Sequence, residues 1–263
     1  MSKDNLGKRI KENYEDRTRI FLPRRTYSII RLDGKAFHSF TKGMHRPYDV
    51  DLMNMMDETA KELCRQIQGA KFAYIQSDEI SILLTDFEKI TTSAWFDGVI
   101  QKIVSVSASI ATVAFNQKWL GYLSRTAKTD NEKLMNYAAF CESYIKVAYF
   151  DSRVFTVPDR AEVANVFIWR QIDATKNSLQ MAARSVYSHK ELDKKNLSQI
   201  QELLFQKGIN WNDYPVGFKR GRLIVKEVND KGRSFWKTTE PPIFTSEEGQ
   251  ALLKSLIPKM DND

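Results

Sequence analysis

Two acidic turns contain the residues of this sequence that are best suited to chemistry. Asp33-Gly34 ends the apolar run 27–32, and Asp78-Glu79 lies between the β-rich segments 72–75 and 80–84. A carboxylate inside a strand is costly unless a cation or hydrogen bonds compensate it. If the two strands lie side by side, Asp33 and Asp78 form a site of oxygen ligands, which hard Mg²⁺ prefers. The alternative is that each Asp only caps a tight turn, because Asp-Gly is a common turn dipeptide.

Such a site would be suited to nucleotidyl transfer. Two carboxylates and a backbone carbonyl could hold two Mg²⁺ ions, one activating a hydroxyl and one bridging the phosphates and the leaving pyrophosphate. The stretch 34–38 follows directly, so its backbone N–H groups and Lys35 could hold a triphosphate. The sequence contains no Walker A loop, and no Ser-His-Asp or Cys-His nucleophile arrangement stands out.

The predicted elements place the two turns next to each other. Hydrophobic periodicity and turn residues predict a strand, a helix, a hairpin, a long helix and a strand region, over residues 27–32, 49–67, 71–84, 93–120 and 144–157. This order is the βαββαβ split unit, in which the first and third strands are neighbours at the centre of the sheet. We therefore expect an α+β fold with a ferredoxin-like, polymerase-palm-like antiparallel sheet, packed helices and a helical C-terminal extension.

The apolar spacing in the second half of the chain predicts mainly helices. Apolar spacing indicates helices over 161–187 and 196–206, one last strand over 222–228, and then a charged C-terminus. We divide the chain into a palm-like catalytic domain, residues 1–158, and a helical and β C-terminal part, residues 159–263, packed on the palm.

The composition is that of an ordinary globular protein. Of the 263 residues, 42% are hydrophobic and 28% are charged. No apolar run reaches the roughly 20 residues of a membrane helix, and the polar start of the chain differs from a secretory signal. We therefore expect a cytoplasmic protein with no membrane partner. Cys64, Cys141 and the three histidines lack the spacing of a zinc site or a disulfide framework.

The net charge of +7 favours a polyanionic partner, because clustered Lys and Arg displace counterions from a phosphate backbone. Basic residues cluster at 8–9, 24–25, 194–195 and 219–222, which makes these positions candidate backbone contacts. The alternative is an ordinary solvated basic face.

Five motifs, in order, resemble the tRNA-His guanylyltransferase family. They are RLDGKAFHSF at 31–40, RP at 46–47, QSDE at 76–79, FDSRVF at 150–155 and WRQID at 169–173. The matches extend over about residues 27 to 225. Residues 175–178 read TKNS, where eukaryotic members carry a His-Ile-Asn-Asn motif. The chain is therefore most similar to the bacterial and archaeal guanylyltransferase-like proteins.

The resemblance implies a polymerase palm that works in the reverse sense and adds nucleotides to the 5′ end of tRNA. It implies two Mg²⁺ ions, GTP and ATP as substrates, and a homo-oligomer, a tetramer. Asp33, the Gly34 carbonyl and Asp78 would bind the metal, and Glu79 would be a further acidic residue of the catalytic site. The nucleotide-binding positions would be Asp33, Gly34, Lys35, Ala36, Phe37, His38, Ser77 and Asp78.

Further positions carried over from the family concern the tRNA. Arg46, where the family usually has Lys, together with Lys102 and Asn177, would act at the activated 5′ end. Basic residues Arg153, Lys219 and Arg220 would face the tRNA.

Because residues 175–178 lack the His of the eukaryotic motif, we expect the chain to carry out template-dependent 5′-end repair, in which Watson–Crick pairing chooses the base. Dedicated guanylate addition to tRNA-His stays open. A third possibility, a GGDEF-type nucleotide cyclase, is disfavoured because this sequence has no Gly-Gly-Asp-Glu-Phe motif. A non-catalytic RNA-binding module is disfavoured because its sheet would display aromatic residues, whereas here acids lie at the strand ends.

Overall fold

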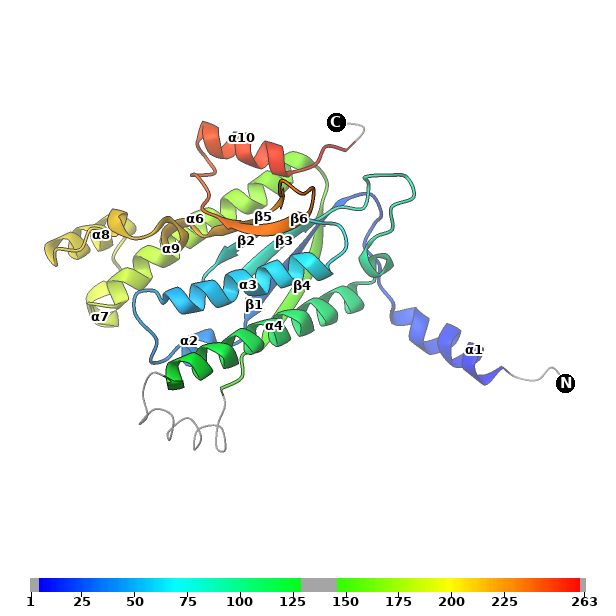
Figure 1. The fold of residues 1–263 in the computed structure, drawn as a ribbon, viewed down its shortest axis with the longest axis horizontal. Coiled ribbons are helices and arrows are strands. Elements are labelled where there is room, and N and C mark those ends of the chain that lie inside the picture. The colour runs from blue at the N-terminus through cyan, green and yellow to red at the C-terminus, as the bar shows by residue number, and fades with distance from the viewer. Residues whose placement is uncertain (1–4, 129–145, 261–263) are drawn as a thin grey trace.

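The computed structural model describes residues 5–128 and 146–260, so Cys141 lies outside the described residues. Its centre is one six-stranded sheet with strand order β4-β1-β3-β2-β5-β6, in which every neighbouring pair is antiparallel (Figure 1). The strands are β1 Tyr27–Gly34, β2 Ala70–Gln76, β3 Glu79–Leu84, β4 Phe150–Val157, β5 Arg222–Val228 and β6 Ser234–Thr239.

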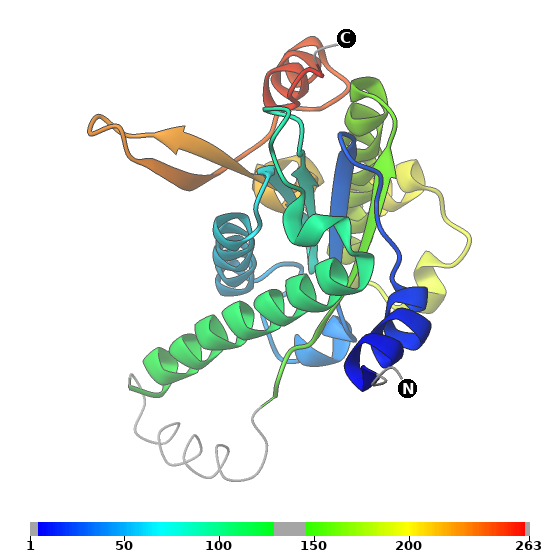
Figure 2. The same ribbon diagram turned by 90° about the vertical axis from the view of Figure 1, so that its right-hand side faces the viewer.

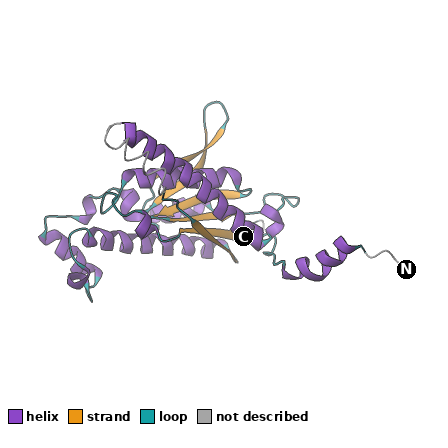
Figure 3. Cartoon of the chain, turned by 90° about the horizontal axis from the view of Figure 1, so that it is seen from below, coloured by secondary structure: helices purple, strands orange, loops and turns teal. Residues whose placement is uncertain are grey.

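Helices of very different lengths surround the sheet. They are α1 Leu6–Ile10, α2 Phe37–Phe40, α3 Val50–Gln66, α4 Ile100–Lys128, α6 Arg160–Arg184, α7 His189–Leu192, α8 Leu197–Gln206, α9 Val216–Arg220 and α10 Glu247–Leu256. A π-helical turn Lys11–Glu15 and a 3₁₀ turn Asp16–Thr18 continue α1. This N-terminal segment has no buried residue and extends away from the body (Figure 3).

The structure confirms the predicted fold class. Strand β1, helix α3, strands β2 and β3, helix α4 and strand β4 follow one another in the βαββαβ order, and β1 lies between β4 and β3. Asp49 caps α3 as expected, because its side chain accepts a hydrogen bond from the Leu52 N–H at 3.0 Å. The hairpin between β2 and β3 has the two-residue loop Ser77-Asp78 that the spacing predicts.

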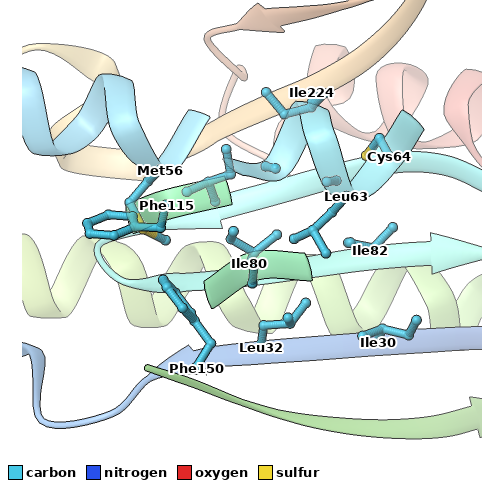
Figure 4. Close-up of a cluster of buried hydrophobic side chains, with 14 of the residues drawn as sticks. Ile30, Leu32, Met56, Leu63, Cys64, Ile80, Ile82, Phe115, Phe150 and Ile224 are labelled. Carbon is cyan, nitrogen blue, oxygen red and sulfur yellow. The ribbon is translucent and has the colours of Figure 1, made fainter. Parts of the chain in front are cut away.

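Alternation along the strands gives the sheet two buried faces. Ile30 and Leu32 on β1 point toward α3 and α4, where they pack with Leu63 and Phe115 in the cluster of Figure 4. Tyr27 and Ile29 on the same strand point to the opposite face, which α6 and α10 cover. Full burial of one such aliphatic side chain stabilises the fold by about 1.5–3 kcal/mol. Because side chains alternate along a strand with a period of two, the odd-numbered residues of β1 face α6.

The helix expected over 93–120 has different bounds in the structure. The turn Trp95–Gly98 is a separate 3₁₀ element in which Phe96, Asp97 and Gly98 have φ values of 50°, 53° and 76°. Positive φ is incompatible with a continuous α-helix. Helix α4 therefore begins at Ile100, and it continues to Lys128.

The expectation that β5 is the last element before a charged C-terminus was wrong. Beyond β5, strand β6 and helix α10 follow, and the hairpin of β5 and β6 extends beyond the body of the protein (Figure 2). Leu253 and Ile257 pack into the core on the α6 face, which the charged composition of this segment concealed. Since β5 pairs with β2, both expected parts of the chain share one sheet. The proposed division at residue 158 stays a prediction.

The strand region expected over 144–157 is shorter in the structure. Residues 144 and 145 lie outside the described residues, 146–149 form no strand, and β4 begins at Phe150. None of the described helices is both long and apolar enough to cross a membrane.

Candidate active site

A row of carboxylates crosses one end of the sheet. Asp33 at the end of β1 pairs in register with Glu79 on β3 and with Asp151 on β4. Directly opposed residues of neighbouring strands point to the same face, and here that is the face covered by α6. The register places the acids side by side, and the sequence alone did not identify Asp151 as a member of the row.

Asp78 joins this row from the tip of the hairpin. The Gly34 N–H donates to the Asp78 carbonyl at 3.1 Å, which ties the two acidic turns together. Ser77 has a φ of 48°, so the loop turns tightly and places Asp78 beside β1. The structure thus brings together the two turns on which the predicted site depends.

Burial and neighbouring acids disfavour the charged forms of Asp33 and Asp78. Burial and the neighbouring Asp33 carboxylate raise the pKa of Asp78 to about 6. Burial, and then the Asp151 carboxylate, raise the pKa of Asp33. Within residues 5–128 and 146–260, neither Asp33 nor Asp78 forms an ion pair. Such unpaired, partly buried carboxylates are suited to a bound cation.

The donor set fits Mg²⁺. In the part of the chain that the structure describes, no three or more His, Cys, Asp or Glu side chains gather around a common metal position. The predicted ligands, two carboxylates and the Gly34 carbonyl, are all hard oxygens. A site with so few protein ligands is usual for Mg²⁺, which keeps waters and binds substrate phosphates.

Glu79 is held by an arginine that we did not predict as a site residue. Arg170 of α6 donates to both carboxylate oxygens of Glu79, from Nε at 2.7 Å and from Nη2 at 2.8 Å. The same Nη2 donates to Asp173 at 3.0 Å, and the guanidinium lies 4.5 Å from the ring centroid of Trp169. Burial raises the pKa of Glu79 while Arg170 opposes that effect. The available signal was the position of Arg170 within the family motif WRQID at 169–173.

A pocket of about 380 Å³ opens beside the acids, between the β2–β3 hairpin, the start of α3, helix α6 and helix α9. This is the size of a small-ligand site. Five predicted residues line it, namely Asp33, Ser77, Asp78, Glu79 and Asn177. Arg46 instead lines an adjoining hollow of about 240 Å³, which shares Tyr48, Asp49, Leu52, Met181 and Arg184 with the pocket.

The segment 33–38 is only partly available to a ligand. Lys35, Ala36 and His38 are exposed, but Phe37 is buried in the core with Phe115 and Phe150. Because the Phe37 side chain faces the core, a nucleotide at this position would contact its backbone, and nucleotide binding by the segment stays a prediction. The N–H groups of Gly34 and Lys35 already donate to the carbonyls of Asp78 and Tyr149.

Lys102 is separated from the acids. It lies in the first turn of α4, with its ammonium 6.0 Å from the Phe96 ring. A residue further along α4, Thr112, reaches the acid end of the sheet by accepting from the Phe150 N–H at 3.2 Å. A role for Lys102 at the same site is therefore not supported by its position.

Two basic residues of the 219–222 cluster are buried, contrary to the expectation that this cluster contacts tRNA. Lys219 is 6% exposed, donates to the Asn212 carbonyl and lies 5.5 Å from the Trp211 ring. Arg222 is 5% exposed and forms an ion pair with Asp57. Arg220 is half-buried. A cluster in the sequence showed charge but could not show where the side chains point.

Arg153 is exposed beside the acid row. It pairs in register with Arg31 and forms an ion pair with Asp151 at 3.2 Å. Its predicted contact with tRNA stays a prediction.

Comparison with known proteins identifies the family. Residues 7–158 match the family described as tRNAHis guanylyltransferase. The chain belongs to this family. Membership confirms the resemblance seen in the motifs, and with it the predicted enzyme class, a nucleotidyltransferase.

Individual relatives agree with this assignment. The tRNA(His) guanylyltransferase of Debaryomyces hansenii is 28% identical over 80% of this chain and 77% of its own length. A solved bacterial tRNA(His) guanylyltransferase-like protein in complex with ATP is 41% identical, with a TM-score of 0.80 over 96% of this chain and 99% of that one. A bacterial guanylyltransferase-like protein in complex with GTP is 39% identical, with a TM-score of 0.73 over 97% and 99% of the two chains.

Proposed function

We propose that this protein adds nucleotides to the 5′ end of tRNA in the 3′-5′ direction, after a nucleoside triphosphate has activated that end. One observation carries the proposal. In a chain of this family, Asp33 and Asp78 both line a pocket of about 380 Å³, a hydrogen bond from the Gly34 N–H to the Asp78 carbonyl joins their two turns, and neither carboxylate forms an ion pair within the described residues. The acids supply what phosphoryl chemistry needs, which is a place to hold cations against phosphates.

Each residue of the site would have a distinct task. Asp33, Asp78 and the Gly34 carbonyl would hold Mg²⁺, which when bound supplies charge neutralisation and a more acidic hydroxyl nucleophile. Arg170 fixes Glu79 by two hydrogen bonds and so keeps that carboxylate in one orientation beside Asp33. The exposed Lys35 and His38 can bind phosphate oxygens. Ser77 lines the pocket and would orient the triphosphate, and Asn177, which lines it as well, would act at the activated 5′ end.

We further propose template-dependent repair of 5′ ends with ATP or GTP as the activating nucleotide. Residues 175–178 lack the His of the eukaryotic motif, which supports repair over guanylate addition to tRNA-His alone. The bacterial relatives solved with ATP and with GTP support both nucleotides. The basic charge of the chain supports binding of tRNA. A cytoplasmic homo-oligomer, a tetramer, is the assembly that we propose from the family resemblance.

The test is nucleotide addition by purified protein with Mg²⁺, labelled ATP or GTP, and tRNA that lacks one 5′ nucleotide. We expect D33N and D78N to lower addition at least about 1,000-fold, because interactions with developing charge dominate such catalysis, while tRNA affinity stays within about twofold. The matched control is D51N, which removes an exposed carboxylate from the first turn of α3. It should leave addition unchanged.

The substrates separate the competing functions. Intact tRNA-His compared with several truncated tRNAs distinguishes guanylate addition from repair. GTP alone would give a cyclic product only for a cyclase, and binding of tRNA without incorporation would indicate an RNA-binding module. Undiminished addition by D33N or D78N would contradict the proposed site.

A further inference from the structure

Gln76, the last residue of β2, has a buried amide oxygen for which the described residues supply no hydrogen-bond donor. The residue is 6% exposed, and its Oε1 has no partner within residues 5–128 and 146–260. Burying such a group without a partner costs its full hydration. Native proteins keep these groups rarely, and where they do, a ligand, an ion or a water usually completes them.

The position of Gln76 in the sheet places this group in the candidate active site. Gln76 pairs in register with Glu79 and lies two residues after Tyr74, so these side chains share the face covered by α6. Its two neighbours on that face are satisfied, since Glu79 is bound by Arg170 and the Tyr74 hydroxyl donates to the Arg220 carbonyl at 2.6 Å. Gln76 itself lines the pocket of about 380 Å³.

The chemistry of the missing partner is constrained. The amide oxygen can only accept a hydrogen bond, and at neutral pH the oxygens of a bound triphosphate accept as well, so a phosphate group does not satisfy it. The partner is a cation or a group that donates an O–H or N–H. In a nucleoside triphosphate the donors are the ribose hydroxyls, the amino group of the base and, in guanine, the ring N1–H.

The remaining walls of the pocket agree with a nucleoside at this place. Met53 of α3 and Phe218 of α9 line it together with Gln76, Asp33 and Asp78. Apolar and aromatic side chains pack against a sugar and a base, with a few polar groups fixing the orientation. Cations held by the acids would attract the phosphates of the same ligand.

We propose that the Gln76 amide oxygen accepts a hydrogen bond from the nucleoside part of the bound triphosphate, either from a ribose hydroxyl or from an N–H of the base. Gln76 is then a residue that orients the nucleotide and contributes to its selection. This inference rests on the proposed function only in taking a nucleoside triphosphate as the ligand of the pocket.

The test compares Q76M with wild-type protein. Met has a similar length and no hydrogen-bonding amide, so it removes the acceptor and keeps most of the volume. The matched control is T238V on β6, because the Thr238 hydroxyl is also buried without a partner in the described residues but does not line the pocket. For each protein, calorimetric titration with Mg-ATP and Mg-GTP gives the nucleotide affinity, and thermal unfolding without nucleotide gives the stability.

We expect Q76M to bind its nucleotide about 5- to 20-fold more weakly, the loss for one hydrogen bond made in a desolvated site. Its melting temperature without nucleotide should not fall, because the unliganded protein loses only an unsatisfied polar group. T238V should likewise keep its stability, and its nucleotide affinity should equal that of the wild-type protein.

Analogue nucleotides identify the donor. If a ribose hydroxyl donates, 2′-deoxy-ATP or 3′-deoxy-ATP binds wild-type protein as weakly as ATP binds Q76M, and Q76M no longer discriminates that analogue from ATP. If the amino group of the base donates, purine riboside triphosphate, which lacks the adenine amino group, shows this behaviour instead. Either pattern supports the proposal.

Two results would overturn it. The first is wild-type nucleotide affinity in Q76M, which would mean that a water satisfies the amide. The second is an equal loss for every analogue, which indicates a structural role if the melting temperature also falls and a cation bound by the amide if it does not. Failure of the proposed function is a separate result, since a protein that binds nucleotides through Gln76 and extends no tRNA contradicts the activity and leaves this inference standing.

Discussion

The substitution D78N should make the protein inactive and more stable at neutral pH. Asp78 lies partly buried beside Asp33, and its pKa is raised to about 6 by burial and by that neighbouring carboxylate. Its charged form is therefore penalised in the folded protein. An Asn at this position has the same shape, carries no charge and can accept the same hydrogen bond from Ser77.

The size and pH dependence of the effect follow from linkage. Below about pH 4, Asp78 is protonated in the folded and the unfolded chain and contributes nothing. Between about pH 4 and 6 only the folded chain keeps the proton, so the stability of the wild-type protein falls as the pH rises. Above about pH 6 the penalty is complete. A shift from 3.8 to about 6 corresponds to at most about 3 kcal/mol, and partial exposure reduces it to about 1–2 kcal/mol.

The assay is thermal and urea unfolding of both proteins from pH 4 to 8 without divalent ions. At pH 8 we expect D78N to melt about 2–4 °C higher, and the difference should vanish toward pH 4. Millimolar Mg²⁺ should stabilise the wild-type protein and narrow the gap, because a ligand that binds only the folded state adds stability. The control D86N should be less stable than the wild-type protein, since Asp86 is bonded to Arg24 at 2.9 Å. A D78N protein that is no more stable at pH 8, or a gap independent of pH, would refute the reasoning.

Three further substitutions test other parts of the structure. R170M should destabilise the protein by about 3 kcal/mol in urea unfolding, because it leaves the carboxylate of Glu79 buried and unpaired. The double variant R170M/E79L should recover most of that loss. Additive losses of stability in the double variant would argue against the ion pair. K219M should leave tRNA affinity in filter binding within about twofold, since the ammonium is buried against Trp211. It should lower the free energy of unfolding by about 1 kcal/mol. A large loss of tRNA affinity would place Lys219 at the RNA instead. G221A should destabilise by more than about 2 kcal/mol in the same unfolding assay, because Gly221 has a φ of 79° and an added Cβ would lie 2.5 Å from a backbone carbonyl of β2; wild-type stability would contradict this.

The local elements of the palm could be predicted well because each depends on neighbours in the sequence. The apolar alternation of β1, the capping Asp49 of α3 and the two-residue loop at Ser77-Asp78 are local signals, and the structure confirms all three elements. The order of these elements then limited the sheet to the arrangement that brings Asp33 and Asp78 together. The C-terminal part was predicted less well, because α10 is a short helix whose few apolar residues become meaningful only against the core on the α6 face.

The sequence by itself determined the fold class, the family motifs and the two acidic turns, since these depend on residue types at short spacing. Tertiary structure alone decided which charges are available. It placed Asp151 beside Asp33, paired Glu79 with Arg170, and buried Lys219. The physical reason is that the burial of a charge, and its partner, depend on strand register and helix packing between residues far apart in the chain, which no local pattern encodes.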